Sequence, residues 1–409
     1  MEAPKMNFAI KAVMNLANLA NWPNAKVANT ALITEFIPEI CKVPYDLLFR
    51  DDAVAMAECT LLVQEYLGLD LLTANMDVYN FEAEAMGAKI KFYPDHCPDF
   101  DRSEYFIQTP EDLEKIKFTG LDKGRFPYLI KYSEVYKKYT GLDSFPIFSA
   151  PWTLAANLYG LDNLVMDCYD DPEFVETFLN KIVDDFHVPM YKELSKVIPG
   201  LREIALVDAM VTVPMVDMRI VQKFIKPNLE RLMEKLEMPN VSLLDTAFFG
   251  SAQLNESDRK IFEDFIVYAN GRYFCSDPDV AILTPEYARQ RANDYMLPLQ
   301  TGINATLIQF GTEEEIVERV KHYVLAGKNG PTPCVFFHNN IAPNAPIENV
   351  MTAIHAVEVY GAPGADENTP YTKPEYPTFE EFLKEKIANN DMGYTFDWLK
   401  KSGYAYLAD

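Results

Sequence analysis

Short apolar runs alternate with long amphipathic helical patterns through most of this 409-residue sequence. The runs are continuously apolar, which is typical of strands buried on both faces of a parallel sheet. Repeated β–α units of this kind indicate either a (β/α)8 barrel or a doubly wound sheet. We expect strands at 70–76, 89–93, 145–150, 203–207, 241–244, 265–269, 305–310 and 334–337.

The glycine pattern favours the barrel. The sequence holds 17 glycines and no GxGxxG motif, so it lacks the phosphate-binding turn typical of doubly wound nucleotide-binding sheets. We therefore predict an α/β fold, a (β/α)8 TIM barrel with an N-terminal helical extension. The expected parts are the extension at 1–65, the barrel at 66–361 with an insertion at about 250–300, and a tail with a short helix at 362–409.

Three helix starts are readable from capping residues. Asp171 precedes a proline at the first helical position, where the missing N–H is tolerated. Thr312 is followed three residues later by Glu315, and Thr378 in the same way by Glu381. Both pairs are capping boxes, in which each side chain bonds the other residue's backbone N–H.

Composition excludes several classes of protein. The 37 Lys and Arg residues against 61 Asp and Glu residues give a net charge of −24, which repels nucleic-acid phosphates and anionic lipid. We see no secretory leader, and no apolar run approaches the roughly 18–20 residues of a membrane helix. The six cysteines contain no CxxC pair, which argues against a disulfide framework or a cysteine-rich zinc module. We expect a soluble cytoplasmic protein that binds neither nucleic acid nor membrane.

Polar residues near the ends of the expected strands are the candidates for chemistry, because barrel active sites lie at the C-terminal ends of strands. Carboxylates and a histidine that converge there could act as acids or bases or bind a metal. For any single residue, the alternative is a helix cap or a loop contact. His96 and Cys97 are adjacent, and adjacent side chains seldom point at one ion, so a loop role is favoured for them. The candidates are Asn75, Asp77, Asp95, His96, Cys97, Asp208, Asp245, Asn304, His338, Asn339 and Asn340.

Four segments together resemble one family. Residues 148–154 (Phe-Ser-Ala-Pro-Trp-Thr-Leu) resemble the strand-to-helix turn of uroporphyrinogen decarboxylases, and residues 167–174 resemble the helix start that follows it. Residues 81–88 are similar to a segment of the related methylcobamide-dependent methyltransferases. Residues 340–350 resemble the closing signature of the superfamily. The resemblance covers roughly residues 45–361 and implies a (β/α)8 barrel with its cleft at the C-terminal mouth.

The resemblance also carries residues over to this sequence. The central aspartate of the decarboxylases matches Asp77, their tyrosine after the turn falls on Asn157, and their histidine falls on Asn339. The arginine-rich segment that binds the carboxylates of a porphyrinogen is absent, since the first fifty residues contain one arginine, Arg50. In the branch that uses coenzyme M, zinc is held by a His-x-Cys-Gly motif, which falls on residues 244–247 (Leu-Asp-Thr-Ala), and by a later cysteine.

That later cysteine also falls on Asn339, so the three soft ligands are missing. Asp245 and His338 stand near the expected positions and could supply harder ligands for zinc. Because no DxHxxG-type cobalamin-binding segment is present, a corrinoid would be carried by a partner protein. The sequence leaves the oligomeric state open, with a homodimer as the commonest closed assembly.

We expect a corrinoid-dependent methyltransferase that moves a methyl group between a small methylated substrate, for example a methoxylated one, and the cobalt of a separate corrinoid protein. Asp77, Glu82, Asp245 or a metal would activate the leaving heteroatom, with His338 as a further catalytic candidate. One alternative is decarboxylation of a porphyrinogen or smaller acid, and another is a barrel that only binds ligands. The expected substrate-binding residues are Asn75, Trp152, Asn157, Asp208, Asn304 and Asn339.

Overall fold

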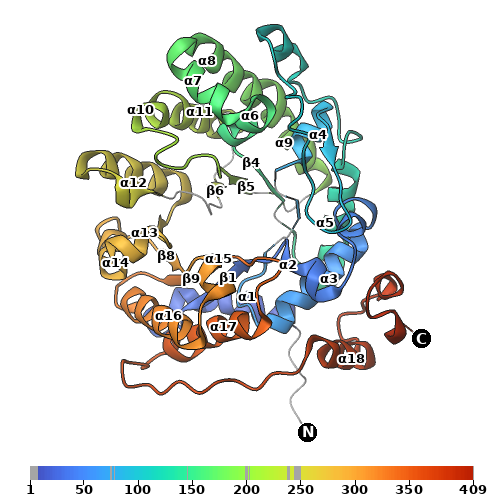
Figure 1. The fold of residues 1–409 in the computed structure, drawn as a ribbon, viewed down its shortest axis with the longest axis vertical. Coiled ribbons are helices and arrows are strands. Elements are labelled where there is room, and N and C mark those ends of the chain that lie inside the picture. The colour runs from blue at the N-terminus through green and yellow to red at the C-terminus, as the bar shows by residue number, and fades with distance from the viewer. Residues whose placement is uncertain are drawn as a thin grey trace.

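The computed structural model describes residues 8–73, 76–77, 79–144, 146–198, 201, 203–236, 240–243 and 250–408. Its parallel strands form two arcs around a common centre (Figure 1). The first arc has the order β1 (Ala28–Leu32), β9 (Cys334–Asn340), β8 (Leu299–Gly302) and β7 (Tyr273–Phe274). The second has the order β4 (Ile147–Ser149), β5 (Glu203–Val207) and β6 (Asn240–Leu243).

The chain order around the ring is that of a TIM-type α/β barrel, which confirms the predicted fold class. Every strand pair within the two arcs is parallel. Between β1 and β4, the segment after Leu69 runs beside β1, because the backbone N–H groups of Asp70 and Leu71 both donate to the carbonyl of Asn29, at 3.2 and 3.3 Å. This segment stands where a second barrel strand is expected.

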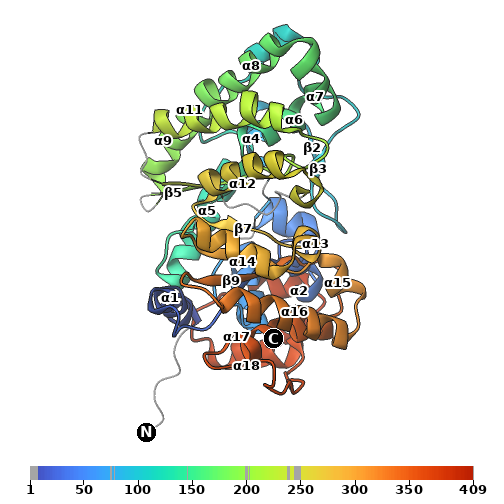
Figure 2. The same ribbon diagram turned by 90° about the vertical axis from the view of Figure 1, so that its left-hand side faces the viewer.

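Helices cover the outside of the ring, and shorter elements follow the strand ends. Figure 2 shows α2, α13, α15 and the β2–β3 hairpin on one side of the molecule, which is the mouth of the barrel. Within the barrel, the helices of ten or more residues are α3 (Ala53–Leu67), α5 (Phe126–Thr140), α7 (Leu161–Asp170), α8 (Pro172–Lys181), α9 (Val188–Val197), α11 (Lys226–Leu236), α12 (Glu256–Asn270), α14 (Pro285–Asp294), α16 (Glu313–Lys328) and α17 (Ile347–Gly361). The shorter ones are α2 (Phe36–Cys41), α4 (Phe81–Met86), α6 (Pro151–Tyr159), α10 (Met218–Ile220), α13 (Asp279–Leu283) and α15 (Ala305–Phe310). Before β1 lies α1 (Phe8–Asn18), and α18 (Phe379–Asn389) lies in the tail.

The three predicted helix starts are confirmed. The side chain of Asp171 accepts the N–H of Phe174 and caps α8, with proline at the first position. Complete capping boxes begin α16 at Thr312 and α18 at Thr378.

Several strand predictions are wrong. Residues 265–269 lie inside α12, and residues 305–310 form α15. Residues 89–93 contain β2 (Ile90–Lys91), which pairs antiparallel with β3 (Asp99–Phe100) in a separate hairpin. A short apolar run is compatible both with a strand and with the buried side of a helix. Residues 265–269 and 305–310 are of the second kind.

Four strands of the described structure were not predicted, namely β1, β3, β7 and β8. β1 contains buried Asn29 and β8 contains buried Thr301, so neither is a continuous apolar run. β1 lies within residues 1–65, where we expected a helical extension, and β7 lies within the expected insertion at about 250–300. The division of the chain into three parts stays a prediction.

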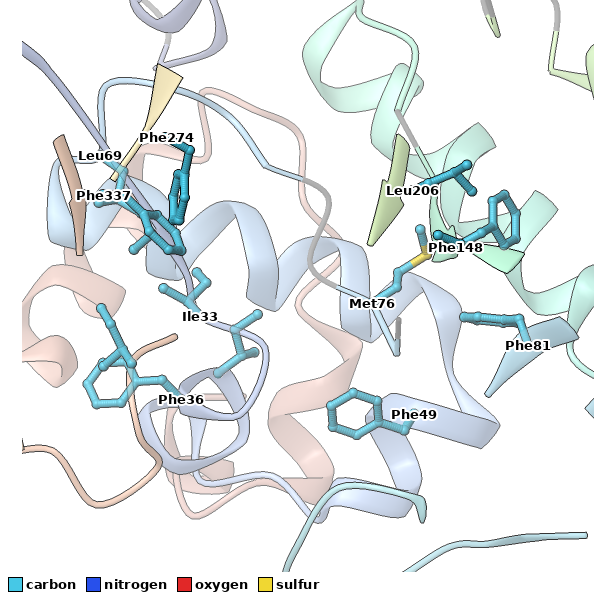
Figure 3. Packing of buried hydrophobic residues seen from close by; sticks show 14 of the residues in the cluster. Ile33, Phe36, Phe49, Leu69, Met76, Phe81, Phe148, Leu206, Phe274 and Phe337 are labelled. Atoms are coloured by element: carbon cyan, nitrogen blue, oxygen red, sulfur yellow. The ribbon is translucent and has the colours of Figure 1, made fainter. Parts of the chain in front are cut away.

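One large apolar core joins the strands to the surrounding helices. Figure 3 shows Phe274 and Phe337 packed together from β7 and β9, and Phe148 and Leu206 together from β4 and β5. Within the described part of the chain, none of the helices combines the length and the apolar character needed to cross a membrane.

Candidate functional site

A buried arginine organises the mouth of the barrel beside β4. Arg125, at the start of α5, donates to Asp77 Oδ2 at 2.6 Å, to Glu84 Oε2 at 2.5 Å and to the carbonyl of Phe49 at 2.7 Å. Asn80 Nδ2 donates to the other oxygen of Asp77 at 2.7 Å. Asp77 and Arg125 are both buried, so each charge needs the other. Asp77 is therefore held as the anion of an ion pair.

Glu82 lies five residues later, and no cation pairs with it among the described residues. Its Oε1 accepts the backbone N–H of Ser149, at the end of β4, at 2.5 Å. The side chain is fully buried, and Oε2 has no partner among the described residues. Burial raises the pKa of Glu82 to about 8, and the nearby charge of Asp77 adds to the rise. Glu82 consequently carries a proton at neutral pH.

Two hydroxyl groups accompany Glu82 in this buried region. The hydroxyl of Ser149 lies close enough to Glu82 to lower the pKa of that carboxyl group, and the hydroxyl of Tyr191 is buried without a partner in the described structure. Tyr191, on α9, packs edge-on against Phe148 with ring centres 5.7 Å apart. The end of β4 thus combines a protonated carboxyl group with two hydroxyl groups, a set of groups that can exchange protons.

The turn after β4 is fastened to the end of β5. Asp208 Oδ1 accepts the backbone N–H of Thr153 at 3.0 Å and its hydroxyl at 2.7 Å. The same hydroxyl accepts the N–H of Met210 at 3.0 Å, and Trp152 Nε1 donates to the carbonyl of Met210 at 3.3 Å. Asp208 and Trp152 are buried. These contacts position the turn, and substrate binding by Asp208 and Trp152 stays a prediction.

His338 faces the helices rather than the centre of the barrel. Side chains alternate along a strand, so Cys334, Phe336 and His338 of β9 share a face. The Sγ of Cys334 would lie 2.7 Å from a Cβ added to Gly327 of α16, which places that face against the helix layer. The ring of His338 lies 5.1 Å from that of Phe336.

Burial lowers the pKa of His338 to about 3, so the imidazole is neutral. Neither ring nitrogen has a partner among the described residues. The position beside the helices does not favour the catalytic and zinc-binding roles expected for His338, which stay predictions.

Next to it, Asn339 has a left-handed backbone with φ of 63°, at an irregularity in the pairing of β1 with β9. Asn340 Nδ2 then donates to Glu35 Oε2, beyond the end of β1, at 3.3 Å. Burial raises the pKa of Glu35, and this hydrogen bond partly offsets the rise.

The loop at 95–97 lies over this side of the mouth. Together with Glu35, Tyr45 and Pro343, the loop lines a cavity of about 300 Å³. His96 bonds Asp95 at 2.8 Å and stacks on Tyr93 with ring centres 3.8 Å apart, and burial raises the pKa of the Cys97 thiol. A loop role for His96 fits these contacts.

On the opposite side, Asn304 caps α15 by accepting the N–H of Leu307 at 2.7 Å. Its own backbone N–H donates to Asp277 Oδ2 at 3.3 Å. Asp277 also accepts the hydroxyl of Tyr323 at 2.6 Å and pairs with Arg319 at 3.2 Å. Asp277 was not predicted because the strand before it, β7, was not predicted. Arg125 was not predicted either, because no local pattern links it to Asp77.

The remaining candidates are Asn157, Asn75 and Asp245. Asn157 lies on α6, is 4% exposed and lines a small pocket, and its Nδ2 has no partner among the described residues. Asn75 and Asp245 lie outside the described residues. Within the described ranges, no group of three His, Cys, Asp or Glu side chains is arranged to hold a metal ion. The described residues therefore give no support to zinc, which rests on His338 and Asp245 alone.

Comparisons with known proteins identify relatives over most of the chain. The family model for uroporphyrinogen decarboxylase (URO-D) matches residues 47–360. A methylated-thiol–coenzyme M methyltransferase from Methanosarcina mazei is 23% identical over 321 residues, which are 77% of this chain and 80% of that protein. A solved structure of a methyltransferase from Methanosarcina mazei aligns with a TM-score of 0.66 at 17% identity, over 85% of this chain and 98% of the other.

Proposed function

The chain belongs to the uroporphyrinogen decarboxylase family, and from this premise we propose that it is a corrinoid-dependent methyltransferase. It moves a methyl group between a small methylated substrate and the cobalt of a separate corrinoid protein. The two methyltransferases from Methanosarcina mazei to which the chain is similar support this choice within the family. We further propose that the protein acts in the cytoplasm.

The observation that carries the proposal is the fully buried carboxyl group of Glu82, whose pKa is raised by that burial. A methyl group bound to oxygen, nitrogen or sulfur leaves slowly, unless the heteroatom receives a proton as the carbon–heteroatom bond breaks. Glu82 holds such a proton at neutral pH because burial raises its pKa to about 8. The corrinoid of the partner supplies the nucleophile that accepts the methyl group.

The surrounding residues keep Glu82 in its acid form. The N–H of Ser149 fixes one carboxyl oxygen, which leaves the other oxygen to carry the proton. The nearby Asp77 stays ionised because Arg125 neutralises it, and its negative charge disfavours a second charge on Glu82. On transfer, the bond electrons stay with the heteroatom, which takes the proton of Glu82 and leaves its carboxylate behind. The proton returns from solvent.

The test is methyl transfer with purified protein, a reduced corrinoid protein and a panel of methylated phenols, amines and thiols. We expect the absorbance of methylated corrinoid to appear with one class of donor. Glu82→Gln should lower kcat about 100-fold while the protein stays folded, because the amide cannot donate the proton. Glu134→Gln, on the exposed side of α5, is the matched control and should be fully active.

The pH profile separates acid catalysis from a structural role. Since the acid form is the active one, the rate should fall as pH rises through about 8, and this fall should be absent in the residual activity of Glu82→Gln. Full activity of Glu82→Gln would remove Glu82 from the mechanism. Consumption of a porphyrinogen, with no methyl transfer from any donor, would favour the decarboxylase alternative.

Zinc is tested separately, by elemental analysis of the untagged protein. About one zinc per chain that is lost on substitution of His338 and Asp245 would support the zinc prediction. A homodimer is checked by the mass of the protein in solution.

A further inference from the structure

Exposed apolar side chains lie on both sides of the barrel mouth. Those on the side of β5 are Met166 and Tyr169 of α7 and Met215 in the loop after β5, with exposed fractions of 60%, 46% and 50%. Those on the side of β7 and β8 are Ile282 of α13 and Phe310 of α15, with exposed fractions of 64% and 75%. We call these five side chains the rim. Figure 2 shows α7, α13 and α15 toward the same side of the molecule, where the mouth lies.

The β5 side of the rim is held together by contacts within the protein. The hydroxyl of Tyr169 donates to Asp217 Oδ2 at 2.6 Å, and the guanidinium of Arg219 lies 4.8 Å from the centre of the Tyr169 ring. Met166 stands one helical turn before Tyr169, on the same face of α7. Met215 stands two residues before Asp217. Figure 1 also shows α7 beside α10, so these side chains belong to one surface.

The loop after β5 presents Met215 to solvent. Val213 and Val216 on either side of it are buried, and the N–H of Val216 donates to the carbonyl of Thr212 at 3.0 Å. A methionine kept in water gains none of the stabilisation that burial would give it. Its unbranched thioether adapts to the shape of a partner, and exposed apolar patches beside a site mark interaction surfaces. Met215 is therefore placed for contact with another molecule.

The charges around α7 have both signs, although the whole chain has a net charge of −24. Burial raises the pKa of the Cys168 thiol, the charges of Asp217 and Asp167 add to the rise, and those of Lys223 and Arg219 counteract it. All four charges consequently act on the same part of α7. A second protein can approach this part of the surface without strong repulsion.

The position of the rim indicates which protein covers it. In a methyl transfer to cobalt, the cobalt has to come within about 3–3.5 Å of the methyl carbon. Glu82 lies at the end of β4, which pairs with β5, so the cobalt has to enter the mouth beside β5. The protein that carries the corrinoid then covers the mouth. Methionine, tyrosine and arginine, which the β5 side offers, are enriched at protein interfaces.

From these features we propose that the rim is the docking surface of the corrinoid protein, which spans the mouth and contacts both of its sides. The proposal rests on the proposed function, because it takes its partner from that reaction. The partner should present an apolar face of low net charge around its corrinoid, as the centre of such an interface is depleted of charged residues.

The experiment uses the corrinoid protein that accepts methyl groups in the assay above. Met215→Glu places a charge in the rim, and we expect its Kd in calorimetric titration and its KM for the corrinoid protein to rise about ten-fold. At saturating corrinoid protein, kcat should stay within about two-fold of its original value, because only binding is weakened.

The matched control is Met296→Glu, which makes the same change of charge at a methionine that is 66% exposed. Met296 lies three residues before β8, at the end of the barrel away from the mouth, and its substitution should leave Kd and KM unchanged. Phe310→Glu tests the other side of the rim and should also weaken binding about ten-fold. The melting temperature of each variant shows that it is folded.

The proposal is overturned if Met215→Glu binds as the unchanged protein does, if it lowers kcat and keeps Kd, or if Met296→Glu weakens binding equally. It is also overturned if Met215→Glu turns a dimer of this chain into a monomer in solution, because the rim is then an interface between two copies. If only Phe310→Glu keeps full affinity, the partner does not span the mouth. Failure of the proposed function has a different signature: the unchanged protein then methylates no corrinoid protein, and the rim loses its partner with it.

Discussion

The two sides of the barrel mouth both contain buried carboxyl groups, but they differ in what surrounds them. Beside β7 and β8, Asp277 receives a tyrosine hydroxyl, an arginine and a backbone N–H. Beside β4, Glu82 accepts the N–H of Ser149 and lies near the negative charge of Asp77. Burial raises the pKa of both groups, while Tyr323 and Arg319 counteract the rise at Asp277.

Burial alone does not determine whether a carboxyl group is charged. The donors and the nearest cation decide whether the charged form is compensated. Asp77 shows the same within one region, since it lies close to Glu82 but forms an ion pair with Arg125. The two sides therefore differ in the charge beside the carboxyl group, which is Asp77 at Glu82 and Arg319 at Asp277.

The largest effect should come from breaking the ion pair between Arg125 and Asp77, which distinguishes Asp77 from Glu82. Arg125→Met leaves Asp77 and Glu84 without their cation in a buried setting. We expect the free energy of unfolding to fall by about 3–5 kcal/mol, measured by urea denaturation. Lys131→Met, on the exposed face of the same helix, should change it by less than about 0.5 kcal/mol. If Arg125→Met lowers the free energy of unfolding by less than about 1 kcal/mol, the ion pair with Asp77 is not needed for stability.

The next effect is a pH dependence of stability caused by Glu82. Its ordinary pKa is 4.5 and its folded pKa is about 8, so between these values the folded state holds a proton that the unfolded state has released. This contribution to stability is fully present below about pH 4.5 and is lost as pH rises to about 8. It amounts to a few kcal/mol.

Glu82→Gln should remove the part of the pH dependence of stability that Glu82 causes, since the amide is neutral at every pH. The measurement is urea denaturation of the wild-type protein and the variant between pH 5 and 9. If the two stability curves stay parallel across this range, Glu82 does not carry a raised pKa.

The smallest effect on stability is expected beside β7 and β8, at Asp277. Tyr323→Phe removes the 2.6 Å hydrogen bond to Asp277 and the bond that the hydroxyl accepts from Arg319 at 3.3 Å, and leaves the pair of Asp277 with Arg319. We expect a loss of about 1–2 kcal/mol in thermal or urea unfolding, as for a hydrogen bond to a charged group. Tyr169→Phe removes a bond of the same 2.6 Å length to Asp217 on the surface and should cost less, because water replaces the donor. Equal losses would mean that burial does not strengthen the bond at Asp277.

The strands were predictable where burial on both faces left a continuous apolar run. The expected strands at 203–207 and 334–337 lie on β5 and β9, and those at 145–150 and 241–244 overlap β4 and β6. The strands that contain Asn29 or Thr301 were missed, because a buried polar residue interrupts each apolar run, and such a residue can find its partner in a distant segment. Asn29, for example, donates to Asp70, 41 residues away.

The sequence by itself determined the family, the barrel class and the helix caps, because these depend on motifs and on hydrogen bonds between near neighbours. The tertiary structure decided which carboxyl groups pair. Arg125 reaches Asp77 across 48 residues, and Ser149 reaches Glu82 across 67. The charge of a buried group depends on solvent exclusion and on partners brought from distant segments, so the proton on Glu82 and the direction of His338 could be read only from the fold.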